Sequence, residues 1–161
     1  MKLQRGLMLL AILSIIGTIP AVAQVDKVAV KTLRLGCGLC AVFSEIYLRQ
    51  IPSVDKIQIS KSKEAVMMTY KPGGTFQPAE IRTALKKTEV GVAQFQIGAR
   101  GRLQEQAGKQ FFVAGKDRFV LVSSPNSPKI PAGSTVSVEG VVNDTANPME
   151  LRVMTVKPIQ P

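Results

Sequence analysis

The chain contains no histidine and no tryptophan, and only two of its 161 residues are cysteine. Without histidine it has no Ser-His-Asp or Cys-His catalysis, no histidine general base and no histidine-ligated zinc. The sequence also lacks the glycine-rich loops that bind nucleotide phosphates in P-loop and dinucleotide-binding proteins. These absences exclude most classes of enzyme, and we expect a protein that is not an enzyme.

The first residues have the pattern of an export signal. Lys2 and Arg5 precede an apolar run over residues 7–16, which is shorter than the about 20 residues that a membrane-spanning helix needs. Ala21-Val22-Ala23 then places small residues at the two positions that a signal peptidase reads. We predict a cleavable signal peptide over residues 1–23 and an exported protein, periplasmic or extracellular, without stable membrane insertion after cleavage. An uncleaved N-terminal anchor is the alternative.

The charge balance of the chain is strongly basic. Lys and Arg number 21 against 11 Asp and Glu, which gives a formal net charge of +10. Such a balance is compatible with acidic partners or with an anionic membrane surface. The basic residues are scattered along the sequence rather than clustered, so we expect no nucleic-acid binding.

Both cysteines fall within four positions, in the motif Cys37-Gly38-Leu39-Cys40. A disulfide that staples a secreted fold normally joins cysteines far apart in sequence, because closing a long loop restricts the unfolded chain more. This pair is therefore expected to serve a chemical role. Two soft thiolates can hold Cu(I), Hg(II) or Ag(I) in near-linear coordination, and the start of a helix favours the thiolate form. Zinc would require four ligands, which a single chain lacks.

Hydrophobic periodicity predicts an α+β unit over residues 27–98. Alternating apolar residues favour strands. Apolar residues at helical spacing before Pro52 favour one helix, and Pro78 at a first helical turn with Lys86 at a last one favours a second helix. The predicted strands cover residues 28–35, 54–60, 64–71 and 91–97, and the predicted helices cover 41–51 and 78–87. The order βαββαβ allows both helices to pack on one face of a four-stranded antiparallel sheet, which is the ferredoxin-like arrangement.

Residues 28–98 resemble the heavy-metal-associated domain of copper chaperones, metal-pumping ATPases and periplasmic mercury-binding proteins. The similarity rests on the element order, on the Cys-x-x-Cys in the first strand-to-helix loop, and on the apolar residues that follow it. In the family, apolar residues occur eight, eleven and fourteen positions past the second cysteine, where this chain has Leu48, Ile51 and Val54. The resemblance implies that Cys37 and Cys40 bind a soft metal ion, Cu(I) or Hg(II).

The chain departs from the family pattern in three places. Arg34-Leu35 stands where the family usually has Gly-Met, and Ser44 stands where an aliphatic residue is common. Near the end of the second helix, where relatives carry Gly-Tyr or a lysine, this chain has Lys87-Thr88-Glu89. Leu35 can replace the methionine as the apolar residue that pins the loop to the core. Lys87 would offset the negative charge of a bis-thiolate complex if its side chain reached the loop.

Residues 99–161 carry no helical pattern and predict a small five-stranded barrel. Runs with strand character cover residues 102–104, 110–114, 118–123, 135–143 and 151–157, and turn signals separate them. The Gly115-Lys116-Asp117 segment predicts a hairpin turn. The region is similar to small OB-type modules of exported bacterial proteins. The expected fold class is thus a ferredoxin-like βαββαβ domain followed by a small OB-like all-β barrel.

Together these observations predict an exported carrier that captures or transfers a soft metal ion through Cys37 and Cys40. Its partner would be a metal-donor or metal-acceptor protein, with the barrel as a docking module. A dimer that shared one ion between two cysteine pairs would also admit zinc. Two alternatives stay open: a thiol-disulfide redox protein that uses the same cysteines, and an interaction module that needs neither.

Overall fold

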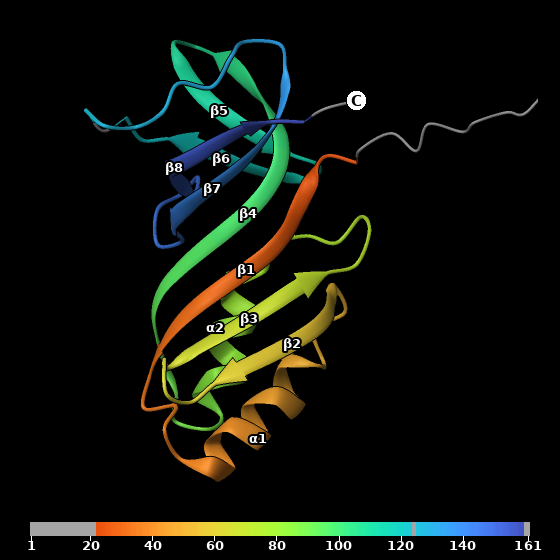
Figure 1. Ribbon diagram of the computed structural model, residues 1–161, viewed down its shortest axis with the longest axis vertical. Helices are drawn as coiled ribbons and strands as arrows, with labels where there is room; N and C mark the ends of the chain where they lie inside the picture. Colours follow the sequence, from red (N-terminus) through yellow and green to blue (C-terminus); the bar gives the residue numbers. More distant parts are fainter. Residues whose placement is uncertain (1–21, 124, 160–161) are drawn as a thin grey trace, which may run out of the picture.

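The computed structural model describes residues 22–123 and 125–159, and these contain two helices and eight strands (Figure 1). The predicted signal peptide lies almost entirely outside the described residues. The elements run in the order β1 (Gln24–Leu33), α1 (Gly38–Leu48), β2 (Val54–Ser60), β3 (Ala65–Tyr70), α2 (Pro78–Lys86), β4 (Gly91–Gln106), β5 (Lys109–Ala114), β6 (Asp117–Leu121), β7 (Thr135–Asn143) and β8 (Glu150–Pro158). Among the described residues, no helix has the length and apolar character needed to cross a membrane.

All of the described strands belong to one sheet, in the order β2-β3-β1-β4-β5-β6-β8-β7. The last five strands in this order are β4, β5, β6, β8 and β7. An additional pairing between the first and the last of them, β4 and β7, closes these five strands into a barrel. Strands β1, β2 and β3 extend the sheet beyond that barrel. Both helices pack on the face of this extension that carries the buried side chains of β1 and β3 (Figure 1).

The expected fold class, a ferredoxin-like βαββαβ domain followed by a separate barrel, is wrong. The barrel takes β4 as one of its own strands, and the same strand pairs with β1 over Gly91–Arg100. Along most of this length β4 lies between β1 and β7, because residues 95–102 pair with β7 at the same time. The expected boundary between residues 98 and 99 therefore falls inside a continuous strand of 16 residues.

Two glycines in β4 explain why the sequence suggested a junction there. Gly98 and Gly101 interrupt the apolar pattern, and such residues usually indicate a turn. In the structure they lie inside the ladder, where the chain is crowded by its neighbours. A Cβ on Gly101 would collide with the Val113 carbonyl oxygen and with the Phe112 ring. Gly101 therefore marks a close approach of β4 to β5 rather than a break between domains.

A single hydrophobic core runs through the helix-covered part of the sheet and the barrel. Phe76, in the loop before α2, connects the two regions, because its ring centroid lies 5.4 Å from that of Phe95 and 6.3 Å from that of Phe119. Phe95 and Phe119 are both fully buried. This shared core explains why the two halves of the sequence form one continuous structure rather than two separate units.

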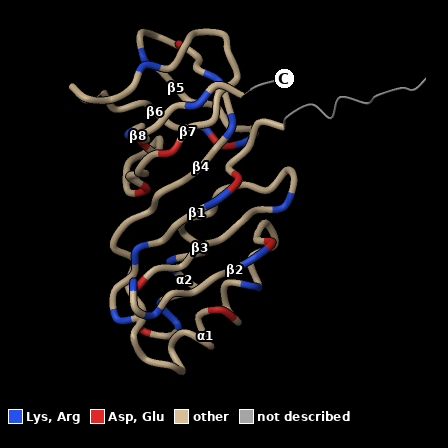
Figure 2. The backbone as a smooth tube through the Cα atoms, viewed as in Figure 1, with Lys and Arg blue, Asp and Glu red and all other residues tan. Residues whose placement is uncertain are grey.

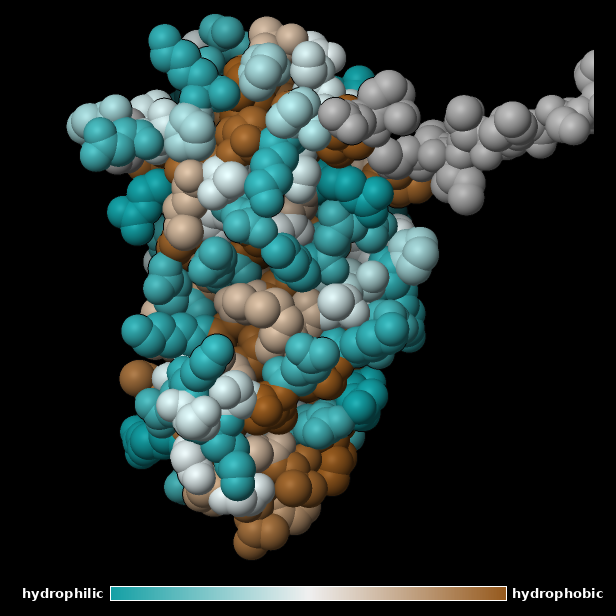
Figure 3. Space-filling model, viewed as in Figure 1, coloured by the Kyte–Doolittle hydropathy of each residue, from teal (hydrophilic) through white to brown (hydrophobic). Residues whose placement is uncertain are grey.

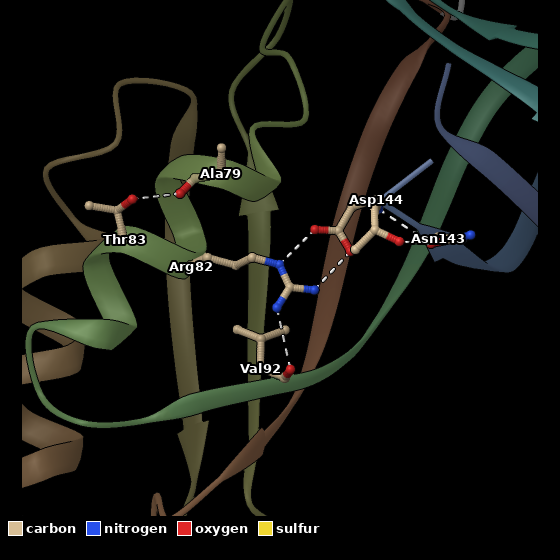
Figure 4. A network of polar contacts seen from close by, with 7 residues as sticks. Ala79, Arg82, Thr83, Val92, Asn143 and Asp144 are labelled. Atoms are coloured by element: carbon tan, nitrogen blue, oxygen red, sulfur yellow. Dashed lines mark hydrogen bonds and ion pairs between the residues drawn. The ribbon is translucent and has the colours of Figure 1, made fainter. Parts of the chain in front are cut away.

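Polar contacts also connect the two regions. Arg82 of α2 donates to both carboxylate oxygens of Asp144 in the β7–β8 loop, at 2.6 and 2.8 Å (Figure 4). The buried carboxylate of Asp117, at the start of β6, accepts hydrogen bonds from the backbone N–H of Phe76 at 3.0 and 3.1 Å. These contacts attach the loop before α2, through Phe76, and α2 itself, through Arg82, to the barrel.

Candidate functional site

Cys37 and Cys40 lie at the N-terminus of α1, at the end of the molecule farthest from the barrel (Figure 1). They form a disulfide, and their Cα atoms are 5.2 Å apart. Cys37 is the N-cap of the helix, with extended backbone angles, and its Sγ accepts a hydrogen bond from the Cys40 backbone N–H at 3.0 Å. The sulfur therefore occupies the place that a serine or aspartate oxygen takes in an ordinary N-cap.

The loop before the motif is anchored by one buried side chain. Leu35 is fully buried, which agrees with the expectation that it pins the loop to the core. The preceding residue, Arg34, has a φ of 67°, in the left-handed region that favours glycine. This is one of the positions at which the chain departs from the heavy-metal-associated pattern, since the family usually has glycine there. An arginine in this conformation stores backbone strain of about 1 kcal/mol directly beside the cysteine motif.

The two cysteines differ in exposure, and the space around the motif is open. Cys37 is exposed, whereas Cys40 is half-buried and packs against the core. A Cβ added to Gly36 or to Gly38 would meet no atom within 4 Å. Cys37 Sγ is therefore the sulfur that an incoming ion or thiol reaches first.

The described residues offer this pair no further ligands of the usual kinds. No group of three or more His, Cys, Asp or Glu side chains in the described part of the chain is placed to hold a metal ion. A hard ion that prefers oxygen ligands, or zinc with its four ligands, is thus poorly served by one chain. Two sulfur atoms by themselves suit a soft ion with two-fold coordination.

Lys87 does not reach the cysteine loop. Its Nζ lies 4.7 Å from the centroid of the Tyr47 ring, where the ammonium makes a cation–π contact. Tyr47 follows Cys40 by seven residues, which places it about 10 Å farther along the helix axis. The structure therefore does not support a role for Lys87 in offsetting the charge of a bis-thiolate complex.

Sequence reasoning missed the outward face of α1. Helical spacing predicted this helix but not which of its apolar residues is buried, and the side chain of Phe43 is 46% exposed. The helix instead buries Ala41, Ser44 and Leu48. Because α1 carries apolar residues on both its inner and outer faces, periodicity alone could not identify the buried one. The presence of apolar residues on both sides of the helix was the sequence signal of an exposed hydrophobic surface.

Comparison with known proteins does not assign this chain to a family. No protein-family model matches the sequence, and no curated protein sequence matches it either.

Proposed function

We propose that this chain is an exported, non-enzymatic protein that binds one soft metal ion, Cu(I) or Hg(II), through Cys37 and Cys40. The ion is captured by the reduced pair and handed to a protein that also presents thiolates. Such an exchange suits soft ions, because sulfur ligands can be replaced one at a time without releasing the ion.

One observation carries this proposal: a pair of sulfurs, with Cys37 exposed and Cys40 half-buried, lies at the start of a helix, with no further ligand group around it in the described residues. The Cys40 N–H already points at Cys37 Sγ, and the free N–H groups of the helix terminus favour negative charge at this place. A pair of thiolates is therefore stabilised where an incoming ion has access. The short spacing of the motif lets both sulfurs contact one ion.

Binding requires that the disulfide is first reduced. A dithiol reductant in the same compartment supplies two electrons and two protons, and it leaves Cys37 and Cys40 as thiols. Each thiol then loses its proton when the ion binds, because the thiolate is the ligand. Metal uptake is thus coupled to the redox state of the compartment and releases protons.

The test is a titration of the reduced protein with Cu(I) under anaerobic conditions, against a competing chelator. We expect one ion per monomer, loss of binding in the Cys37→Ser, Cys40→Ser double variant, and no binding by the oxidised protein. A matched control is the Met67→Ser, Met154→Ser variant, which removes two exposed soft side chains far from the motif and should bind as the wild type does. Uptake that survives in the double serine variant would contradict the proposal.

A second candidate function is thiol-disulfide exchange, and the disulfide itself favours it. In such a reaction a substrate thiolate attacks the exposed Cys37 sulfur, the Cys37–Cys40 bond breaks, and a mixed disulfide forms with release of the Cys40 thiolate. The reduced protein would accordingly reduce a test disulfide, with a reduction potential near that of the compartment. Tight Cu(I) uptake without exchange activity would favour the carrier function, and exchange without tight uptake would favour this alternative.

A further inference from the structure

Four apolar side chains form an exposed row along α1, which we call the α1 stripe: Leu39, Val42, Phe43 and Ile46. Their exposed fractions are 70%, 55%, 46% and 49%. The spacing of three and four residues places all of them on one side of the helix. Apolar exposure of this kind in one contiguous place is typical of an interaction surface.

The packing of the fold does not explain the α1 stripe. The opposite side of α1 already supplies the buried residues Ala41, Ser44 and Leu48, and Leu48 is fully buried. A surface helix needs only one apolar face to pack on a sheet, and its outer face is normally polar. The outer face of α1 instead exposes apolar side chains over most of its length.

The α1 stripe lies at an end of an elongated molecule. Helix α1 forms the lower end of the molecule in Figure 1, with the barrel at the other end of the long axis. Figure 3 shows hydrophobic surface gathered at the same lower end. A flat surface can therefore approach α1 without contacting the barrel.

The surroundings of the α1 stripe are basic. Three segments lie near α1: the end of β1, the β2–β3 turn and the residues after α2. The Thr32 hydroxyl at the end of β1 donates to the Glu64 carbonyl oxygen in the β2–β3 turn, and the Ser44 hydroxyl of α1 contacts the Thr88 hydroxyl after α2. The exposed basic residues of these segments are Arg34, Lys61, Lys86 and Lys87, and the acidic ones are Glu64 and Glu89, whereas Lys31 and Lys63 line the open face of the sheet with Gln94 and Gln96. The charge of Glu45 on α1 is balanced by Arg49, the C-cap residue of the helix, at 2.6 Å. Figure 2 shows several Lys and Arg segments along one side of the lower part of the molecule.

We propose that the α1 stripe docks this protein reversibly on an anionic lipid surface. Apolar side chains that enter the boundary between headgroups and acyl chains, combined with basic residues around them, are the two signals that together hold a peripheral protein on a bilayer. Each Lys or Arg close to an anionic bilayer adds further attraction. Docking in this orientation brings Cys37 and Cys40, which lie at the same end of α1, next to the membrane.

The charge and shape of this end favour a lipid surface over another copy of the chain. Two copies that met through their α1 stripes would bring two basic rims together, and like charges that face each other oppose association. The four side chains of the stripe carry no hydrogen-bonding group, whereas protein interfaces combine an apolar centre with directional polar contacts. An anionic bilayer needs neither hydrogen bonds nor shape complementarity from its partner.

The absence of tryptophan from the chain provides a direct probe. The variant Phe43→Trp, in the chain from Gln24 onward, which contains every described helix and strand, reports only on the α1 stripe. Its emission should shift to the blue when vesicles of phosphatidylcholine and phosphatidylglycerol are added. Vesicles of phosphatidylcholine alone should leave the spectrum unchanged, and brominated lipids should quench the shifted emission. An unchanged spectrum with anionic vesicles would overturn the proposal.

Co-sedimentation with the same anionic vesicles separates the two signals. Phe43→Ser with Ile46→Ser should weaken binding by roughly tenfold or more, because apolar burial and electrostatic attraction are both required. Lys86→Glu with Lys87→Glu should weaken it as well, because Lys87 lies against Tyr47 of α1, and added salt should do the same to the wild type. The exposed methionine variant, Met67→Ser with Met154→Ser, should bind as the wild type does. The proposal would be overturned if the stripe variant bound vesicles as well as the wild type does. It would also be overturned if the Phe43→Trp variant formed a stable dimer that shields its indole before lipid is added.

Discussion

Ser44 Oγ lies 2.8 Å from Thr88 Oγ1, so that the buried side of α1 is tied to the residues that follow α2. Thr88 Oγ1 donates its own proton to the Leu85 carbonyl oxygen at 2.9 Å. Ser44 is therefore the donor in the contact between the two hydroxyls. Ser44 and Thr88 are also two positions at which the sequence departs from the heavy-metal-associated pattern. The structure shows that the side chains at these two positions contact each other.

This pairing predicts unequal effects of two single substitutions. Thr88→Val should cost about 1–2 kcal/mol of unfolding free energy, because it leaves the fully buried Ser44 hydroxyl without its acceptor. Ser44→Ala should cost less, since Thr88 keeps its bond to Leu85. The double variant should cost less than the sum of the two, which chemical denaturation in a double-mutant cycle can measure. Additive effects would show that the two hydroxyls do not interact.

A buried carboxylate predicts a pH dependence of stability. Burial raises the pKa of Asp117 to about 6 from its ordinary value of 3.8, although the Phe76 N–H partly offsets the effect of burial. The folded protein thus holds this proton more tightly than the unfolded chain does. The resulting stability is complete below pH 4 and is lost as the pH rises to about 6, by up to roughly 3 kcal/mol.

The Asp117→Asn variant tests this pH dependence. Its amide oxygen can still accept from the Phe76 N–H, but the side chain does not titrate. Relative to the wild type, the variant should therefore gain stability between pH 4 and pH 6. Urea unfolding of both proteins at several pH values measures this difference. Parallel curves would show that Asp117 titrates in the same way in the folded and unfolded states.

The ion pair between Arg82 and Asp144 should behave in the opposite sense. The hydrogen bonds from Arg82 lower the pKa of Asp144, so its contribution to stability is present above the unfolded pKa near 4 and is lost at lower pH. Arg82→Ala should cost about 1–2 kcal/mol at neutral pH, because it leaves the Asp144 side chain, only 9% exposed, without its partner.

A matched control for this pair is present on α1. Arg49 and Glu45 are also 2.6 Å apart, but their side chains are 55% and 40% exposed. Glu45→Gln should therefore change the unfolding free energy by about 0.5 kcal/mol or less. If the two ion pairs proved equally weak in thermal or urea unfolding, the link between α2 and the β7–β8 loop would not stabilise the fold.

The two glycines of β4 predict different tolerances to alanine. Gly101→Ala should destabilise the protein by about 1–3 kcal/mol, because the added methyl group meets the Val113 carbonyl and the buried Phe112 ring. At Gly98 the same methyl group meets only the flexible side chain of Lys27, which is 49% exposed and can move aside. Gly98→Ala should therefore cost clearly less, and comparison of the two melting temperatures measures this. Equal losses would contradict the close approach of β4 to β5.

Local elements were predicted well because their signals lie within a few residues of each other. Helix α2 runs over Pro78–Lys86, with Pro78 in its first turn and Lys86 in its last, as the sequence indicated. Strands β2 and β7 cover the residues that alternation predicted. The position of the cysteine motif at the start of α1 also followed from the sequence, although α1 begins three residues earlier than expected, at Gly38. The metal-binding role of these cysteines stays a prediction.

The arrangement of these elements depends on contacts between distant residues, which local patterns do not contain. The pairing of β4 with β7 joins residues 33 to 47 positions apart, such as Phe95 and Val142, and it turned two expected units into one continuous sheet. The burial of Asp117 depends on a loop that lies 41 residues earlier in the chain.

The sequence by itself determined the candidate chemistry: two cysteines without histidine, predicted at the start of a helix, in a basic chain with a predicted export signal. Only the tertiary structure decided that one strand serves both parts of the sheet, and that Phe43 faces outward while Ser44 faces inward. The physical reason is that residue type and spacing set local conformation, whereas burial and strand partners depend on which distant segments come together.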